Sequence, residues 1–495
     1  MKTFYFCLYR FRLKIQKNII WPSTTKLFVL NDLLCLSLKM TQSIVIQIGQ
    51  CGNQIGYRFW DAALREFQKY GETQLDSKNP LSFFSKSSSG KKSSKKEQNL
   101  KARAVLIDME EGVINEILKS SLRGLFNHNQ LITDVSGAGN NWAVGHLEYG
   151  QQYKDSISEV IRKTAEECDC LQCFFCLHSM GGGTGSGVGT FVLRLLEDEY
   201  PEIFRFSTVV YPSETDDVIT SPYNSILAMH NLTEAADCVL SIENQALLRM
   251  IRNMSKGKKT ITGANENTDN RKAFDDMNDI VANLLINMTC SARFEGSLNV
   301  DLNEISMNLV PYPKLHYITS SMAPIYSLSK RVDFSLRHIN QMFTDTFTKD
   351  HQLMQVDPAR GLYLACSLLV RGNVELSDIR QNIERLKPNL NFVHWNKEGW
   401  KVGLCSVPPL NYSSALLTLA NNTCFHHPCI DIRNRFMKLY RRKAHLHHYT
   451  RVDGFEEDLI KDSLVSLDSL IDEYESLEKS VTNPLPSLPR LQIAQ

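Results

Sequence analysis

Residues 181–187 read Gly-Gly-Gly-Thr-Gly-Ser-Gly, and this loop decides the fold that we expect. The apolar run 173–177 precedes it, and residues 188–200, which have helical periodicity, follow it. Glycines let a backbone approach an anion and turn successive N–H groups toward it, and the N-terminus of the next helix adds its positive end. The order of strand, glycine loop and helix therefore indicates a phosphate-binding site in an α/β fold. Tight turns and linkers are also rich in glycine, so the flanking segments have to decide.

Three other segments support a phosphate site. Residues 43–48 are expected to form a buried strand that runs into a second glycine turn, 49–56, and residues 102–107 a third strand that ends at carboxylates. A small-residue loop with side-chain amides follows at 136–142. Ligands of open α/β sheets bind at the carboxyl ends of the strands. Neither of the two new glycine loops has the G-x-G-x-x-G spacing, and Walker's G-x-x-x-x-G-K-[ST] is absent from the sequence, so a nucleotide site of another design is needed.

The four loops, in this order and spacing, resemble those of the tubulin and FtsZ superfamily of GTPases. Ser186 gives the glycine loop the form found in eukaryotic tubulins. Later segments continue the resemblance, which covers about residues 40–477: 293–304, 309–316 and 441–447. Within the superfamily, three stretches are most similar to the epsilon class of tubulins: 40–43, 168–175 and 221–229.

The resemblance implies the domain organisation. Residues 40–246 would form the GTP-binding domain around a Rossmann-like parallel sheet, residues 247–433 an α+β intermediate (activation) domain, and residues 434–495 the C-terminal helices and tail. A chain of 495 residues with 43% apolar content is large enough for two or three cores. Apolar patterns at 433–440 and 463–477 predict two amphipathic helices, which in this family cover the outer surface and face binding partners.

The first 39 residues match no part of a tubulin. They carry a formal charge of +6, so the remaining residues carry −5, which gives no reason to expect nucleic acid as a partner. No apolar run reaches the roughly 18 residues that a membrane span needs. Asn31 and Asp32 interrupt the stretch 28–38, which would otherwise suit a signal peptide, and a mitochondrial presequence is a further alternative. We expect the fold to start at Met40, with residues 1–39 a disordered or artefactual extension.

Thirteen cysteines without a clear export signal predict reduced thiols. Four of them, Cys168, Cys170, Cys173 and Cys176, fall within nine residues and have a spacing that would suit zinc. In a strand, however, Cys173 and Cys176 point to opposite faces of the sheet. We therefore expect no metal at this cluster.

The tubulin pattern implies a role for each residue of the phosphate site. Four residues would hold the β- and γ-phosphates of GTP: Ser179, Gly183, Thr184 and Gly185. Asn140 would close over the γ-phosphate. Asp108 and Glu110 would steady Mg²⁺ through water, because a hard divalent cation is expected between carboxylates and phosphates.

The same pattern implies how the nucleoside is held. Gln50 and Cys51 would line the phosphate and ribose side, and Asp217 would meet the ribose. Asn244 and Asn278 would read the base, since a carboxamide offers a donor to guanine O6 and an acceptor to its N–H groups, which adenine does not match. Phe274, where other tubulins often carry tyrosine, would stack on the purine.

Hydrolysis in this family uses an acid from the next subunit, carried on a G-x-x-N-x-D-x-x-E segment. The segment is complete in this chain: Gly296, Asn299, Asp301 and Glu304. Asp301 and Glu304 would therefore act in trans on a neighbour's GTP, and the monomer would be slow or inactive. The alternative is that both acids only cap a helix.

Several segments depart from the ordinary tubulins. Ser221 stands where alpha- and beta-tubulins carry glutamate, the lateral-contact segment 322–336 does not follow theirs, and residues 483–495 are proline-rich and lack an acid. Two polar, basic insertions, 86–101 and 253–272, predict solvated loops, with docking of an acidic partner or phosphorylation as the alternative.

The epsilon resemblance implies a GTP-binding protein of the cytoplasm and cytoskeleton, at the centrosome, centrioles and basal bodies of cilia. It would support centriole duplication and stability and triplet microtubules, with delta-tubulin or alpha/beta-tubulin as longitudinal partners and centriolar proteins besides, and without nucleic acid or membrane. A lattice-forming microtubule subunit is the first alternative. An unrelated nucleotide-dependent enzyme, such as a Rossmann dehydrogenase, is the second.

Overall fold

A computed structural model describes residues 41–70, 82–86, 100–213, 216, 218–255, 266–294, 296–326 and 339–482. Several predictions concern residues outside these ranges: the leader 1–39, Asp217, the tail 483–495 and most of the segments 86–101, 253–272 and 322–336. The other candidate site residues are all described.

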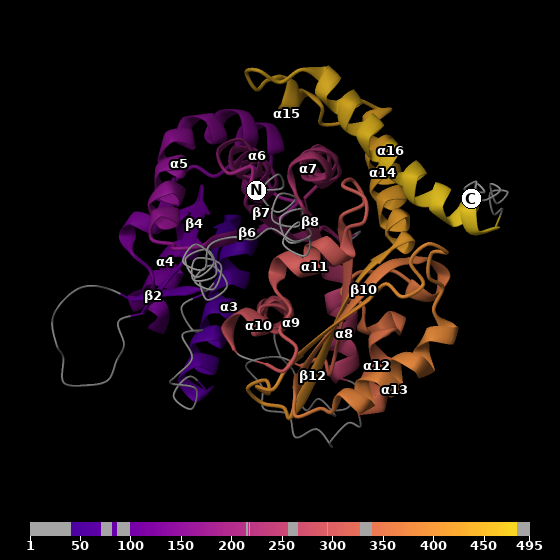
Figure 1. Ribbon diagram of the computed structural model, residues 1–495. Coiled ribbons are helices and arrows are strands. Elements are labelled where there is room, and N and C mark those ends of the chain that lie inside the picture. The colour runs from indigo at the N-terminus through magenta and orange to yellow at the C-terminus, as the bar shows by residue number, and fades with distance from the viewer. Residues whose placement is uncertain are drawn as a thin grey trace, which may run out of the picture.

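A ten-stranded sheet, in the order β11-β10-β12-β9-β8-β7-β6-β1-β4-β5, is the centre of the described chain (Figure 1). Neighbouring strands pair in parallel from β9 to β5: β9 (Tyr317–Ala323), β8 (Cys238–Glu243), β7 (Phe204–Tyr211), β6 (Leu171–Ser179), β1 (Gln42–Ile48), β4 (Ala104–Asp108) and β5 (Leu131–Thr133). Ile44 and Ile46 pack in one core and Val45 in another, on the opposite face of the sheet. Strands that are apolar on both faces need helices on both sides.

Helices cover both faces. One face carries α3 (Gly49–Tyr70), α4 (Glu111–Lys119), α8 (Asn244–Ser255), α9 (Glu266–Met288) and α11 (Leu302–Leu309). The other carries α5 (Gly150–Glu166), α6 (Gly189–Glu199), α7 (Ser221–Ala235), α14 (His426–Tyr440) and α16 (Glu457–Thr482). In Figure 1 the two C-terminal helices α14 and α16 run along the outer side of the molecule, and α16 packs against α7. This arrangement confirms the α/β fold with a parallel sheet and C-terminal helices.

The second half of the chain extends the same sheet. β12 (Ser414–Asn422) pairs antiparallel with β9 and with β10 (Tyr363–Gly372), and β11 (Trp400–Cys405) pairs parallel with β10. α12 (Ile339–Thr346) and α13 (Leu376–Leu386) pack on this part in a separate core. The remaining short elements are β2 (Phe84–Lys86), β3 (Leu100–Ala102), α10 (Cys290–Arg293) and α15 (His447–Thr450). The α+β character is present, but the β8–β9 pair joins the strands of both halves into one sheet.

Two predicted loops and one predicted helix differ from the structure at their ends. The loop prediction for 253–272 is wrong at both ends, because α8 continues to Ser255 and α9 already begins at Glu266. Polar residues such as Glu, Asn and Lys extend a helix readily once a packed apolar segment has formed it. The ends of 86–101 pair as β2 and β3, and the helix predicted at 188–200 follows a π-helical turn, Thr184–Val188. Among the described helices, none combines the length and the apolar character needed to cross a membrane.

Candidate functional site

The glycine loops meet at the carboxyl ends of β1, β4 and β6. Gly49 directly follows β1 with a φ of +71°, and a Cβ placed on it would lie 3.1 Å from the Gly185 nitrogen. A Cβ on Gly183 would lie 2.7 Å from the Ala138 carbonyl oxygen. Only glycine leaves room for these loops to touch. The glycine turn 49–56, the first loop along the chain, and the loop 136–142, the third, therefore pack directly against the phosphate loop 181–187, which follows β6.

The phosphate loop starts where β6 ends. Ser179 is the last residue of the strand, and a Cβ on Gly185 would lie 2.7 Å from its hydroxyl oxygen. The Ser186 hydroxyl donates to the Gly182 carbonyl, which closes the turn. Thr184 and Ser179 remain half-buried beside the first N–H groups of the helical segment. The structure therefore brings together the four residues predicted to hold phosphate, at a helix N-terminus that favours an anion.

Asn140 lies over this loop in a left-handed conformation, with a φ of 53°. Its carbonyl oxygen accepts hydrogen bonds from Thr220 Oγ1 at 2.8 Å and from Asn224 Nδ2 at 2.9 Å. Its own side chain is exposed, and its Oδ1 lies 3.7 Å from the position of a Cβ on Gly182. The backbone is fixed while the amide stays free to meet a ligand, as its predicted role requires.

Asn224 organises these loops, and sequence reasoning missed it. This fully buried side chain donates to the carbonyl oxygens of Asn140 and Gly181, each at 2.9 Å. Its Oδ1 accepts from the Trp142 backbone N–H at 2.9 Å and from the Tyr449 hydroxyl at 2.6 Å. One amide thus connects the third loop, the phosphate loop and the C-terminal helical region. Asn224 lies in the segment 221–229, which the sequence analysis used only for the resemblance to the epsilon class. No sequence pattern indicates that an asparagine side chain is buried.

The acidic edge fits a divalent cation. Asp108 is buried at the end of β4. Its pKa is raised to about 7, mainly by burial and also by the negative charge of the nearby Glu110 carboxylate, although hydrogen bonds from backbone N–H groups oppose this. Its Oδ2 has no hydrogen-bond partner among the described residues. Glu110 is exposed, and Gly137 N donates to the neighbouring Met109 carbonyl at 2.8 Å, so the third loop lies beside these acids. A buried carboxylate with one unpaired oxygen is stabilised by a cation, which would favour its charged form again.

This edge of the sheet carries too few protein ligands to hold a metal ion by themselves. Across the part of the chain that the structure describes, no group of three or more His, Cys, Asp or Glu side chains is placed to do so. Mg²⁺ keeps several waters and takes phosphate oxygens as ligands. Asp108 and Glu110 therefore fit a Mg²⁺ ion that a nucleotide brings with it.

The residues predicted to contact the base lie on α8 and α9, and those predicted for the phosphate and ribose side lie on α3. Asn278 donates from Nδ2 to Gln54 Oε1 at 3.3 Å, so it faces α3 one turn beyond Gln50 and Cys51. Phe274 stands one turn before Asn278 on the same face of α9 and is 54% exposed. The structure groups Gln50, Cys51, Phe274 and Asn278 on one side of the loops. Asn244 begins α8 at the carboxyl end of β8.

The segment that contains Asp301 and Glu304 lies at the opposite end of the sheet. Asp301 caps α11, accepting from Leu302 N at 2.8 Å, and Gln172, near the start of β6, also donates to it. Gln172 and Ser179 are separated by about 23 Å of strand. Glu304 is half exposed and forms an ion pair with Lys401 Nζ at 2.6 Å. Glu304 therefore cannot reach the phosphate loop of its own chain, and Asp301 does cap a helix, as the alternative interpretation of this segment expected.

Comparison with known proteins identifies the family. The model described as "Tubulin/FtsZ family, GTPase domain" matches residues 42–252, and "Tubulin C-terminal domain" matches residues 313–432. The Tubulin epsilon chain of Homo sapiens is 56% identical over 475 residues, which cover 92% of this chain and 100% of the relative. The chain belongs to the tubulin family.

Other tubulins match over nearly the same length. The Tubulin epsilon chain of Mus musculus is also 56% identical, over 92% of this chain and 100% of the relative. The Tubulin beta-1 chain of Chondrus crispus is 32% identical, over 88% of this chain and 94% of the relative. The expected resemblance to the epsilon class is thus confirmed. The whole of α9 and the segment 296–304 fall between the two family-model matches but inside the alignment with the epsilon chains.

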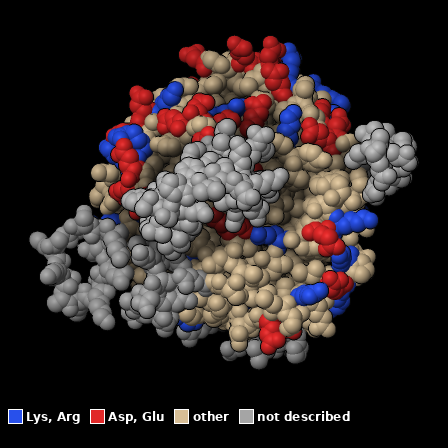
Figure 2. Space-filling view, in the orientation of Figure 1, with Lys and Arg blue, Asp and Glu red and all other residues tan. Residues whose placement is uncertain are grey.

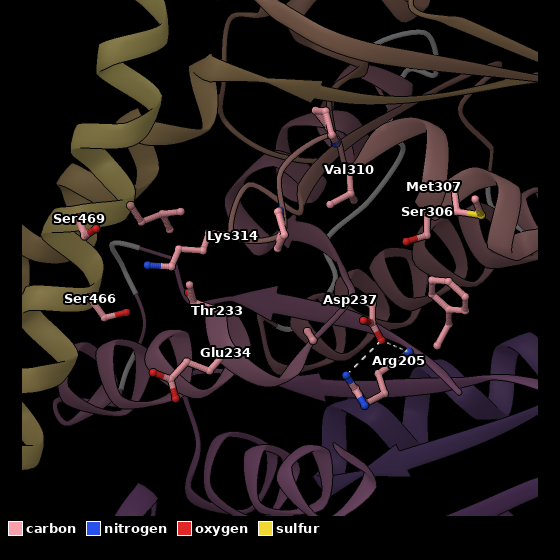
Figure 3. A pocket seen from close by; sticks show the side chains of 15 residues that line it. Arg205, Thr233, Glu234, Asp237, Ser306, Met307, Val310, Lys314, Ser466 and Ser469 are labelled. Carbon is pink, nitrogen blue, oxygen red and sulfur yellow. Dashed lines mark hydrogen bonds and ion pairs between the residues drawn. The ribbon is translucent and has the colours of Figure 1, made fainter. Parts of the chain in front are cut away.

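A pocket of about 510 Å³ lies away from the glycine loops of this tubulin-family chain (Figure 3). Arg205 and Asp237, at the amino ends of β7 and β8, form an ion pair on one side of it, and Met307, Lys314 and Ser469 lie on others. The amino ends of parallel strands are opposite to the carboxyl ends where the loops meet. This pocket therefore does not belong to the candidate nucleotide site and lies on the side of the molecule that includes α11.

The cysteine-rich strand packs as expected from strand geometry. Cys173 lies in the core under α3, with its sulfur 3.2 Å from Ser43 Oγ, and Cys176 lies in the core on the other face of the sheet. The Cys168 sulfur accepts from Arg103 Nη1 at 3.3 Å. These thiols lie in three different surroundings.

Acid should destabilise the domain around the phosphate loop through His178. This fully buried ring bonds Ser207 Oγ at 2.9 Å, and burial lowers its pKa from 6.5 to about 4. The neutral ring contributes up to about 3 kcal/mol to the free energy of unfolding. This contribution is fully present above pH 6.5 and is lost as the pH falls toward 4. Denaturant unfolding from pH 7 to pH 4 gives the free energy of unfolding as a function of pH. The slope of this dependence should be smaller by about one proton in His178→Gln than in the parent chain. The exposed His394→Gln is the control, and equal slopes in both variants would contradict the assignment.

Proposed function

We propose that this chain binds GTP with Mg²⁺ at the edge formed by the glycine loops. The observation that carries the proposal is the meeting of three glycine loops at the N-terminus of a helical segment, beside the buried Asp108, whose Oδ2 has no hydrogen-bond partner among the described residues. Ser179 and the N–H groups of residues 183–185 bind the β- and γ-phosphates, and Asn140 closes over the γ-phosphate. Asp108 and Glu110 hold waters of the Mg²⁺ ion, which neutralises phosphate charge when bound.

The guanosine part lies against α3 and α9. Gln50 and Cys51 line the phosphate and ribose side, and Asn244 and Asn278 bind the polar edge of guanine. Phe274 stacks on the ring, and its exposed face supports this role because a large aromatic side chain is otherwise costly to leave in water. Asp217 completes the set at the ribose, as the tubulin pattern implies.

Asn278→Ala should weaken GTP binding by roughly 1–3 kcal/mol, because guanine would lose a matched partner inside the complex. ATP should bind poorly to both forms. Titration calorimetry with GTP and ATP, together with identification of the nucleotide that copurifies, measures both expectations. Asn283→Ala, at a buried amide further along α9, is the matched control for helix stability. Equal affinity of the parent chain for GTP and ATP would end the guanine assignment.

The segment from Gly296 to Glu304 acts on the GTP of a longitudinal neighbour. Its place at the amino end of the sheet, opposite to the glycine loops, supports a head-to-tail contact between tubulin subunits. Leu298 and Met307, at 38% and 72% exposure, offer apolar contact area on that side. Figure 2 shows few charged side chains over α10 and β12, which also suits a protein interface. The enzyme would thus be a GTPase whose site is shared between adjacent subunits.

The cellular role follows from the epsilon resemblance and is part of the proposal. We propose that the chain acts in the cytoplasmic cytoskeleton, at the centrosome, centrioles and basal bodies of cilia, where it supports centriole duplication, stability and triplet microtubules. Its partners would be delta-tubulin, alpha/beta-tubulin and centriolar proteins. Imaging of the tagged chain against centriolar and microtubule markers tests this role. Incorporation along all microtubules would instead favour the lattice-forming alternative.

A further inference from the structure

A stretch rich in basic side chains follows α14. Residues 441–451, which we call the basic segment, contain three histidines and no aspartate or glutamate. Four exposed arginine and lysine side chains belong to it: Arg441, Arg442, Lys443 and Arg451. Within the described ranges none of these four forms an ion pair, and the ion pairs that flank the segment along the sequence belong to Arg433 and Lys461. The basic segment is therefore an exposed concentration of positive charge that no described carboxylate neutralises.

Hydrogen bonds from buried side chains hold the backbone of the basic segment in place. The Tyr223 hydroxyl donates to the Ala444 carbonyl at 2.7 Å, and Asn141 Nδ2 donates to the His448 carbonyl at 2.8 Å. Tyr449 is fully buried and packs on Tyr223 with ring centroids 5.3 Å apart. The segment is thus ordered before a partner arrives, which reduces the entropy lost on binding.

The three histidines of the basic segment lie next to one another. The ring centroids of His447 and His448 are 4.0 Å apart, and those of His445 and His448 are 6.0 Å apart with nearly parallel planes. The positive charge of His448 lowers the pKa of His447 most, and the charges of Arg451 and His445 lower it further. Cations therefore repel one another on this surface, and a bound anion would relieve the repulsion.

We propose that the basic segment is a docking surface for an acidic peptide, a short stretch of aspartate and glutamate residues in a partner protein. Carboxylates of the peptide pair with the arginine and lysine side chains, in charge-assisted hydrogen bonds. The imidazole N–H groups of the histidines donate to the remaining carboxylate oxygens. Docking at this surface does not rest on the binding of GTP.

A short acidic peptide fits this surface better than a nucleic acid does. Exposed acids follow the basic segment directly, at and before the start of α16: Asp453, Glu456, Glu457 and Asp458. A nucleic acid strand carries a phosphate at every nucleotide, so a strand longer than the segment would extend toward these carboxylates and be repelled. A peptide needs only a few acidic side chains and can end within the basic segment.

Fluorescence anisotropy with the folded full-length chain and a labelled ten-residue glutamate peptide tests the proposal. Binding should be saturable and should weaken as the salt concentration rises from roughly 50 to 300 mM, because salt screens exposed charges. A glutamine peptide of the same length should not bind. Binding that salt leaves unchanged would overturn the proposal. A single-stranded DNA of ten nucleotides that binds as tightly as the glutamate peptide would overturn the choice of a peptide partner.

Charge reversal locates the site, because residues 1–39 and the insertion 86–101 are basic as well. The variant Arg442→Glu, Lys443→Glu and Arg451→Glu should bind the glutamate peptide at least about tenfold more weakly than the parent chain. A matched control with the same change in net charge reverses three exposed cations elsewhere: Lys119, Arg123 and Lys154. Equal affinity of the two triple variants for the glutamate peptide would overturn the proposal.

A milder variant guards against a loss of fold. Lys443→Ala with Arg451→Ala removes two exposed charges without introducing new ones, and thermal unfolding should match that of the parent chain. Peptide binding should still weaken about threefold or more. An affinity equal to that of the parent chain in this variant would also overturn the proposal.

Discussion

Glu304→Ala is expected to slow GTP turnover in end-to-end complexes about 100-fold or more, with GTP binding to the altered chain unchanged. A side chain that positions water or takes its proton contributes roughly 10²–10⁴-fold to such a step. Glu304 lies at the far end of the sheet from its own phosphate loop, so the loss must appear at the neighbour's nucleotide. Single-turnover phosphate release in mixtures of the variant with a GTP-loaded partner measures the rate, and filter binding measures the affinity.

Variants on the same helix separate catalysis from stability. Met307→Ala, at a 72% exposed position of the proposed contact area on α11, should weaken end-to-end assembly but leave turnover within saturated complexes unchanged. Asp301→Ala removes the N-cap and should lower the free energy of unfolding by about 1 kcal/mol. Lys401→Ala frees Glu304 from a partly exposed ion pair, which contributes at most about 1 kcal/mol to stability. An isolated chain that hydrolyses GTP rapidly at any concentration, and loses this activity in Glu304→Ala, would refute action in trans.

Asn224→Ala should cause a larger loss of GTP affinity than Asn278→Ala, at least about 100-fold. The substitution removes the hydrogen bonds from Asn224 to the Gly181 carbonyl and to the Trp142 N–H, and one of the two hydrogen bonds to the Asn140 carbonyl. Each buried polar group left unpaired costs about 1–3 kcal/mol. The third loop and the phosphate loop would no longer be held in their binding geometry. Titration calorimetry with GTP and thermal unfolding measure affinity and stability on the same protein.

A buried amide on the same helix provides the control. Asn231 donates to the Leu227 carbonyl at 2.9 Å and accepts from Arg194, away from the loops. Asn231→Ala should lower stability with little change in GTP affinity. Tyr449→Phe removes the 2.6 Å hydrogen bond to Asn224 and a longer one, 3.3 Å, to the Thr220 carbonyl, and should give a smaller loss of affinity. Equal losses of affinity in Asn224→Ala and Asn231→Ala would show that the first variant acts through stability alone.

The phosphate loop and the acids were accessible from sequence because their signals are local. Glycines between an apolar run and a helical pattern mark the loop at 181–187, and Asp108 follows a buried strand directly. Asn224 and Tyr449 were not accessible, because each acts through partners more than 40 positions away. The start of α9 at Glu266 was missed for a related reason, since polar residues extend a helix whose packing lies further along.

The sequence by itself determined the α/β fold, because strand, glycine loop and helix follow one another within a few residues, and the resemblance of its four loops indicated the tubulin family. It also determined which residues are candidates for phosphate, base and cation. Only the tertiary structure decided which of them meet: the loops converge because the strands that precede them lie side by side in one sheet. It also decided that Glu304 lies at the opposite end of the sheet from its own phosphate loop. Such contacts join residues distant in the chain, and local patterns of hydrophobicity and spacing carry no information about them.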